Sequence, residues 1–74
     1  MNQDEKDRLG LILKKYRIKN NMTLEYVADK LNITHKSVQF WEQGKNEIKL
    51  SKLIAISKLY NISIDSILAE ANIK

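Results

Sequence analysis

Apolar residues recur along the chain at the three-to-four-residue spacing of helices that bury one face. The first run follows an acidic stretch at residues 4–7, which suits the positive end of a helix dipole. Thr23, Thr34 and Ser63 each stand directly before a later run, where a hydroxyl oxygen can cap a helix. The pattern predicts an all-α chain with helices at residues 4–20, 24–31, 35–43, 50–60 and 64–71.

The predicted joints between these helices are short. Asn20 and Asn21 tolerate the left-handed backbone that ends the first helix, and Gly44 stops the third in the same way. Asn32 and Ile33 leave room only for a tight turn between the second and third helices. With no proline, two glycines and no low-complexity segment, all 74 residues are expected to form one compact helical domain.

The predicted helix 35–43 has two chemically different faces. At about 100° per residue, Val38 and Trp41 fall on one side and define its core face. The other side carries a cation, two amides and an aromatic ring, with a histidine and a serine at its margins. These outward residues are Lys36, Gln39, Phe40 and Gln43, with His35 and Ser37 beside them. A face that only meets solvent favours Glu and Lys, so this composition indicates a binding surface.

A helix of this length fits the major groove of DNA, and helix-turn-helix proteins read base edges with such side chains. Ala28 is small where two helices must cross closely, and the short turn at Asn32 and Ile33 fixes their angle. Helix 24–31 would then lie across the DNA backbone. The sequence therefore predicts a helix-turn-helix that binds double-stranded DNA.

Charge supports this interpretation without deciding it. The chain holds 13 Lys and Arg against 9 Asp and Glu, a formal net charge of +4. From Lys30 to Lys58 there are six lysines and two glutamates, so this segment alone carries the whole excess. A basic surface of this kind suits a polyanion. Lysines that only solvate helix faces are the alternative.

Several function classes are not expected. The chain has no cysteine, which excludes disulfides and thiolate metal sites, and His35 has no partner histidine. Without a nucleophile-and-base arrangement or a phosphate loop, we expect neither an enzyme nor a cofactor. No apolar run approaches the roughly 20 residues of a membrane span. The lack of cysteine fits a reducing compartment, so a cytoplasmic location is predicted. Abundant Lys, Asn and Ile are typical of an AT-rich bacterial or phage genome.

From Leu9 to about Leu68 the chain resembles the Cro and phage-repressor type of helix-turn-helix domain, the XRE family. Three segments carry the resemblance: "LGLILKKYR", "MTLEYVADKLNITHKSVQFWEQGK" and "LSKLIAISKLYNISIDSIL". The second is the specific one, because many of its residues stand at the family's spacing. They are Thr23, Glu25, Val27, Ala28, Leu31, Ile33, Thr34, Ser37, Val38, Trp41, Glu42, Gly44 and Lys45.

The resemblance implies a lambda-repressor-like fold whose third helix reads DNA. It implies base-reading roles for His35, Lys36, Ser37, Gln39 and Phe40. It implies phosphate contacts from Thr23, Thr34, Gln43, Lys45, Asn46 and Lys49. It also implies a structural pairing of Arg17 with Glu42, beside the packing residues Ala28, Val38 and Trp41.

Three positions depart from the family pattern. Leu24 stands where many members have a glutamine that holds a phosphate. Asn32 replaces the usual glycine of the turn, which asparagine tolerates because it accepts positive φ. Ile48 and Lys49 replace the common Pro-Ser before the fourth helix, whose start therefore lacks a good cap.

Three of the outward residues have open alternatives. Gln39 could read adenine through N6 and N7 or bridge to a base through water, but a phosphate contact or plain solvation would also explain it. Lys36 suits the O6 and N7 atoms of guanine, but a phosphate contact or plain solvation would also explain it. The Phe40 ring could meet a thymine methyl group, or it could fold back against the loop around Ile48 as part of the core.

A monomer of this size places one helix in the groove and buries a small core, so we predict a homodimer. It would act as a repressor-type transcriptional regulator that reads a palindromic operator. The expected dimer surface is Ile67, Leu68, Ala71 and Ile73. The alternative is an antitoxin-like or adaptor module that binds a protein partner, with DNA binding secondary, which Phe40 also suits.

Overall fold

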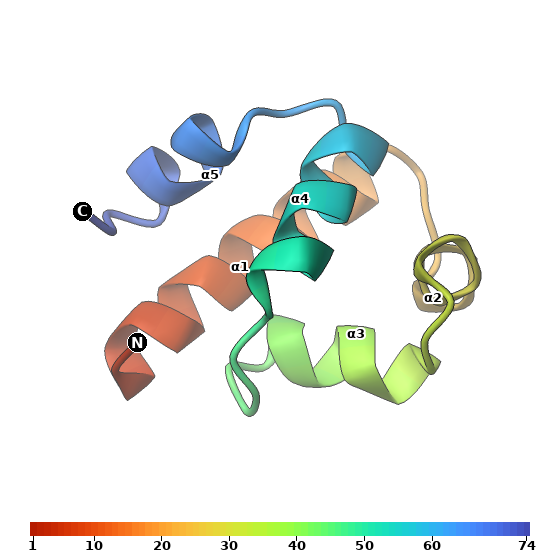
Figure 1. Cartoon of the computed structure of the whole chain (residues 1–74), viewed down its shortest axis with the longest axis horizontal. Coiled ribbons are helices and arrows are strands. Elements are labelled where there is room, and N and C mark those ends of the chain that lie inside the picture. The colour runs from red at the N-terminus through yellow and green to blue at the C-terminus, as the bar shows by residue number, and fades with distance from the viewer.

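The computed structural model describes all 74 residues, Met1–Lys74, and contains five helices and no strand. The helices are α1 (Gln3–Lys19), α2 (Leu24–Leu31), α3 (His35–Glu42), α4 (Leu50–Leu59) and α5 (Ile64–Glu70). The all-α prediction is confirmed, and each helix begins and ends within one residue of its expected bounds. Figure 1 shows α5 beside α1, α2 almost end-on, and α3 along the lower edge. None of the five has the length and apolar character needed to cross a bilayer.

Side-chain oxygens cap four of the five helices at their amino ends. Thr23 accepts a hydrogen bond from the amide of Tyr26 at 3.0 Å, and Thr34 accepts one from Ser37 at 3.3 Å. Ser63 and Asn2 cap α5 and α1 in the same way. Lys49 stands at the start of α4 and makes no such bond, in agreement with the expected weak start of that helix.

Every helix ends in a short turn with one left-handed residue. That residue is Gly44 after α3, with φ +73°, and an asparagine elsewhere: Asn21, Asn32, Asn61 and Asn72, with φ between 54° and 58°. The next residue donates its N–H to the carbonyl five positions back, as Ile33 does to Ala28 at 3.0 Å. Where an asparagine is used, the following side chain also packs against the core: Met22, Ile33, Ile62 and Ile73. Asn20, expected to share this role, keeps a negative φ of −89°.

All five helices contribute to one core. Its most deeply buried large side chains include one from each helix in turn: Leu13, Val27, Val38, Ile56 and Ile67. Burying each such side chain stabilises the fold by about 1.5–3 kcal/mol relative to exposure. The core therefore depends on every helix, and no helix is an appendage.

The burial of α5 corrects one prediction. Ile67 is 0% exposed and Ala71 is 1% exposed, so neither can form the predicted dimer surface. The reason is their spacing: residues four apart lie on one face of a helix, and this face of α5 meets the core. Leu68 and Ile73 remain half-buried.

Helix α4 buries only some of its apolar residues. Leu53 and Ile56 are buried, but Leu50 is 67% exposed and Ile54 also faces solvent. Lys52 of the same helix donates a hydrogen bond from Nζ to the carbonyl of Leu31 at 3.1 Å. It thereby satisfies a carbonyl at the carboxyl end of α2 that has no partner within the helix.

The backbones of α1 and α3 touch at Gly10. A Cβ atom at this position would lie 2.5 Å from the carbonyl oxygen of Trp41 and 2.6 Å from that of Glu42. Both distances are far below van der Waals contact, so only glycine allows this approach. Gly10 therefore fixes how closely α1 can lie against the end of α3.

Arg17 and Glu42 form the ion pair that the resemblance implies. Arg17 Nε and Glu42 Oε2 are 2.7 Å apart, and a second bond joins Arg17 Nη2 to Oε1 at 3.1 Å. A third bond runs from Arg17 Nη1 to the carbonyl of Met22 at 2.9 Å. The side chains are only 12% and 6% exposed. The hydrogen bonds to Glu42 raise the pKa of Arg17, so the guanidinium stays charged although it is largely buried.

We expect Glu42→Ala to lower the free energy of unfolding by about 3–5 kcal/mol, because it leaves Arg17 charged, desolvated and unpaired. Glu70→Ala is the matched control. It removes an exposed ion pair with Lys15 and an exposed hydrogen bond from the Tyr16 hydroxyl, so its loss should be about 1 kcal/mol. Urea titration followed by circular dichroism measures both. Equal midpoints for the two variants would contradict a buried pair that matters to stability.

Candidate nucleic-acid interface

Helix α3 presents the two faces that its sequence predicts. Val38 and Trp41 are buried against the rest of the molecule, and Thr34 caps the amino end, which fixes the rotation of the helix. His35 and Lys36 are exposed on the other side. In Figure 1, α3 forms one edge of the molecule, and no other helix covers its outward side. A convex ridge of side chains therefore projects into solvent.

The outward residues divide into a crest and two flanks, because successive residues turn by about 100°. Lys36 and Gln43 form the exposed crest. Gln39 lies on the flank toward α1, where it lines a hollow with Lys14, and Phe40 lies on the flank toward the loop after α3. We call this set of four residues the ridge. Its mixture of a cation, amides and a ring matches the groups that read base edges.

Of the two predicted arrangements of Phe40, the structure argues against the one in which the ring folds back into the core. The ring is half-buried, but it is not among the side chains that pack against the core. The Lys45 ammonium lies over it, 5.3 Å from the ring centroid, within the range of a cation–π contact. Phe40 thus stays at the surface, and one face of its ring supports a lysine of the loop.

The loop after α3 brings several predicted phosphate ligands to the same flank. Asn46 and Lys49 line a hollow together with Ser37 of α3 and with Glu47, whose carboxylate is paired with the amino-terminal ammonium at 3.0 Å. Lys45, Asn46 and Lys49 are all exposed. The hydroxyl of Ser37 lies 3.1 Å from that of Thr34, so these two groups are hydrogen-bonded to each other. Lys52 also lines the hollow, but its ammonium is already bound to Leu31.

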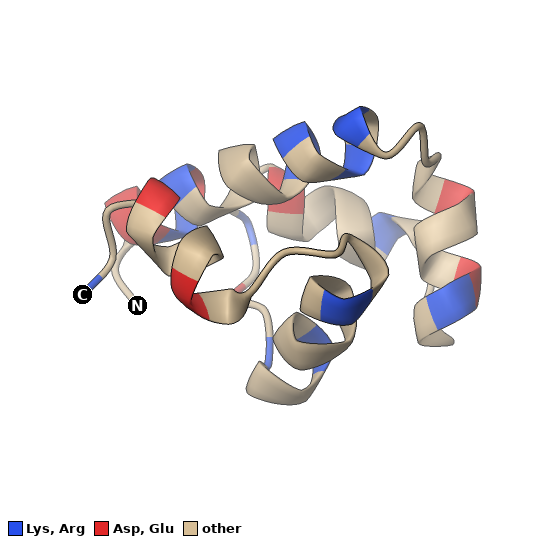
Figure 2. Ribbon diagram, turned by 90° about the horizontal axis from the view of Figure 1, so that it is seen from above, with Lys and Arg blue, Asp and Glu red and all other residues tan.

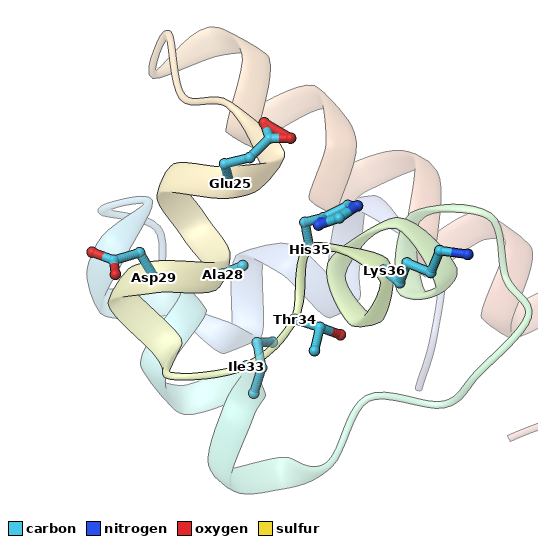
Figure 3. Close-up of a pocket in the computed structure, with 7 residues that line it drawn as sticks. All are labelled: Glu25, Ala28, Asp29, Ile33, Thr34, His35 and Lys36. Atoms are coloured by element: carbon cyan, nitrogen blue, oxygen red, sulfur yellow. The ribbon is translucent and has the colours of Figure 1, made fainter.

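A second hollow separates α2 from the start of α3 (Figure 3). Two carboxylates of α2, from Glu25 and Asp29, line one wall, and His35 and Lys36 line the other. The Lys36 side chain points away from α2 in this view. Carboxylates repel phosphate, so this hollow is a poor place for a DNA backbone, although a carboxylate can accept a bond from a cytosine amino group.

Charge is unevenly spread over the molecule. Acidic residues concentrate near the two chain termini and on α2, whereas basic residues lie on the second half of α1 and on α4 (Figure 2). Glu42 is the one acidic residue of α3, and its charge is buried and matched by Arg17. The ridge therefore carries no exposed negative charge.

Some of the residues that shape this interface have weak sequence signals. Gly10 and Lys52 set the positions of α3 and α2, yet neither belongs to the motif. Only a long-range contact reveals their roles. No cluster of three or more metal-ligating side chains occurs in the structure.

Comparison with known proteins agrees with this geometry. Residues 13–67 match the family model described as helix-turn-helix. The HTH-type transcriptional activator BcrR of Enterococcus faecalis is 32% identical over 57 residues, which cover 77% of this chain. The HTH-type transcriptional regulator YqaE of Bacillus subtilis (strain 168) is 38% identical over 63 residues, or 84% of this chain. The matches span only 28% and 54% of those two proteins. Neither name denotes an enzyme.

Solved structures show the same fold. The clp gene regulator ClgR from C. glutamicum superimposes with a TM-score of 0.86 at 22% identity, covering 92% of this chain and 87% of ClgR. The wild-type restriction-modification controller protein C.Esp1396I gives a TM-score of 0.78 at 20% identity, with coverage of 92% and 88%. With the matched family model and the two-faced α3, these findings establish that the chain belongs to the Cro and phage-repressor type of helix-turn-helix family.

Proposed function

We propose that this chain is a sequence-specific regulator of transcription that inserts α3 into the major groove of double-stranded DNA. The observation that carries the proposal is the ridge, an uncovered row of Lys36, Gln39, Phe40 and Gln43 on a helix held rigidly from behind. A helix inserted in this way meets base edges with its outward residues. The 74 residues would act as one domain, in the cytoplasm where the DNA is accessible.

The ridge and its amino end supply the base contacts in this proposal. Lys36 suits guanine through O6 and N7, and Gln39 suits adenine through N6 and N7. His35 and Ser37, near the capped end of α3, contact bases at the margin. Phe40 offers the free side of its ring to a thymine methyl group while Lys45 covers the other side.

Phosphate contacts surround the ridge and position it without reading sequence. Lys45, Asn46 and Lys49 are exposed on the loop flank, and Gln43 stands at the carboxyl end of the crest. Thr23 and Thr34 accept bonds from backbone amides as caps. The Thr23 hydroxyl keeps a proton that it can donate to a phosphate, and the Thr34 hydroxyl does so when Ser37 donates the bond between their two hydroxyls.

Two copies are needed for a palindromic site, and we propose that they pair through the surface of α5 that stays exposed. Leu68 and Ile73 line a hollow together with Asp65 and Lys74. In an isologous contact the acid of one copy can face the lysine of the other. Repression is the simplest outcome, because occupying a promoter is sufficient to block it, although the relative BcrR is named an activator.

DNA titration at two salt concentrations tests the central proposal. Affinity for random duplex DNA should fall steeply as salt rises, with a slope of log K against log salt of about −0.9 per phosphate contact. A module that binds only proteins would bind this DNA weakly at both concentrations. That result would favour the antitoxin-like or adaptor alternative.

Two lysine variants separate base reading from phosphate binding. Lys36→Ala should weaken a preferred site, found by selection from a random duplex pool, by about 1–3 kcal/mol more than it weakens random DNA. Lys45→Ala should weaken both by the same factor and reduce the salt slope by about 0.9. Equal losses on both DNAs for Lys36→Ala would reduce that residue to a backbone contact.

Sedimentation velocity tests the dimer. Leu68→Asp should shift the protein toward monomer, because it places a carboxylate in an apolar contact, whereas Leu50→Asp changes an exposed leucine of α4 and should not. Selected DNA should contain two half-sites about 10–10.5 base pairs apart, or a multiple of that spacing. A wild-type monomer both in solution and on its preferred DNA would contradict the proposal.

A further inference from the structure

A small hollow opens where α1, α2 and α3 meet. Its α3 wall contains Gln39, on the flank of the ridge opposite Lys45, and Gln43, one turn later on the crest. Leu24, the first residue of α2, forms another wall. The remaining lining residues are Lys14, Arg17 and Glu42. The hollow thus belongs to the same outward side of the molecule as the ridge, but it lies over α1.

Lys14 is the uncompensated charge of this hollow. Arg17 and Glu42 neutralise each other, and the remaining lining side chains are amides or apolar. Lys14 is exposed and takes part in none of the four ion pairs of the structure. The next residue differs sharply, because Lys15 binds Glu70 at 2.9 Å on another side of α1. An unpaired lysine beside the ridge is available to an anion.

The geometry of a bound duplex indicates that this anion is a phosphate of the DNA backbone. A helix in the major groove has one DNA strand on each flank, because the groove is about 12 Å wide. The loop with Lys45 serves one flank of α3. On the other flank, the first helix of the motif crosses the backbone. Helix α2 begins there with Leu24, whose side chain donates no hydrogen bond, and Glu25 and Asp29 farther along repel phosphate.

We propose that Lys14 binds a backbone phosphate of the strand that α2 crosses. Lys14 and Lys45 then hold α3 from its two flanks, each through a different DNA strand. This inference rests on the proposed DNA-binding function and adds to it a contact from α1, outside the helix-turn-helix itself. The contact is independent of sequence, so it contributes equally at preferred and random sites.

The neighbouring lysines provide a matched test. Lys14→Ala and Lys15→Ala remove the same charge from adjacent positions of one helix, so any general effect of net charge is equal in both. Binding of the full chain to preferred and to random duplex DNA is measured over a range of salt. Lys14→Ala should lower the affinity for both DNAs by the same factor and make the salt slope shallower by about 0.9. Lys15→Ala should keep the wild-type slope, and Lys14→Arg should restore binding.

The outcomes distinguish this inference from the proposed DNA-binding function on which it rests. If the wild type shows the steep salt dependence but Lys14→Ala and Lys15→Ala behave alike, the phosphate contact of Lys14 is wrong and the proposed function stands. A loss confined to the preferred DNA would also overturn it, because Lys14 would then read a base. If the wild type does not bind duplex DNA, the proposed function itself fails. Unfolding followed by circular dichroism should show the same midpoint for the Lys14→Ala variant and the wild type, because Lys14 forms no ion pair in the fold.

Discussion

The buried ion pair between Arg17 and Glu42 determines where α3 lies. One guanidinium holds the last residue of α3 with two bonds and the carbonyl of Met22 with a third, so three segments are fixed at one point. Desolvated charges resist separation, because each would remain buried without its partner. Beside this pair, Gly10 lets α1 touch the backbone of α3. A helix held in this way would lose little further freedom on binding a partner.

Local signals predicted most of the fold. Thr23, Thr34 and Ser63 mark helix starts because capping needs only the residue and its next few amides. The turns at Asn61 and Asn72 repeat the sequence signal of Asn32, an asparagine followed by an apolar residue, although that signal alone is too short to mark a turn. Gly10 could not be predicted in the same way. Its role depends on which residues of α3 lie against α1. The residues next to Gly10 in the sequence contain no information about that long-range contact.

The sequence predicts which side of α3 faces outward. It predicts less well which contacts the individual side chains of the site make. Periodicity separates the core face of α3 from the ridge, because polar and apolar residues alternate there at helical spacing. It fails on α4, where Leu50 and Ile54 belong to a helix that is apolar on several sides and happen to face solvent. The contact between Lys45 and Phe40 depends on how the loop folds back, which sequence spacing does not specify. The roles of individual residues toward bases and phosphates stay predictions.

The single left-handed residue at Asn32 has a consequence for how such a protein can diversify. One extra residue in this turn would disrupt the bond from the N–H of Ile33 to the carbonyl of Ala28, and with it the angle between α2 and α3 that sets where the ridge points. Insertions and deletions here should therefore be eliminated by selection. The residues of the ridge contribute little to the packing that holds the helix. Substitutions at these positions are therefore tolerated by the fold. Target preference can drift by point changes among descendants of one ancestor, while the length of the connector stays constant.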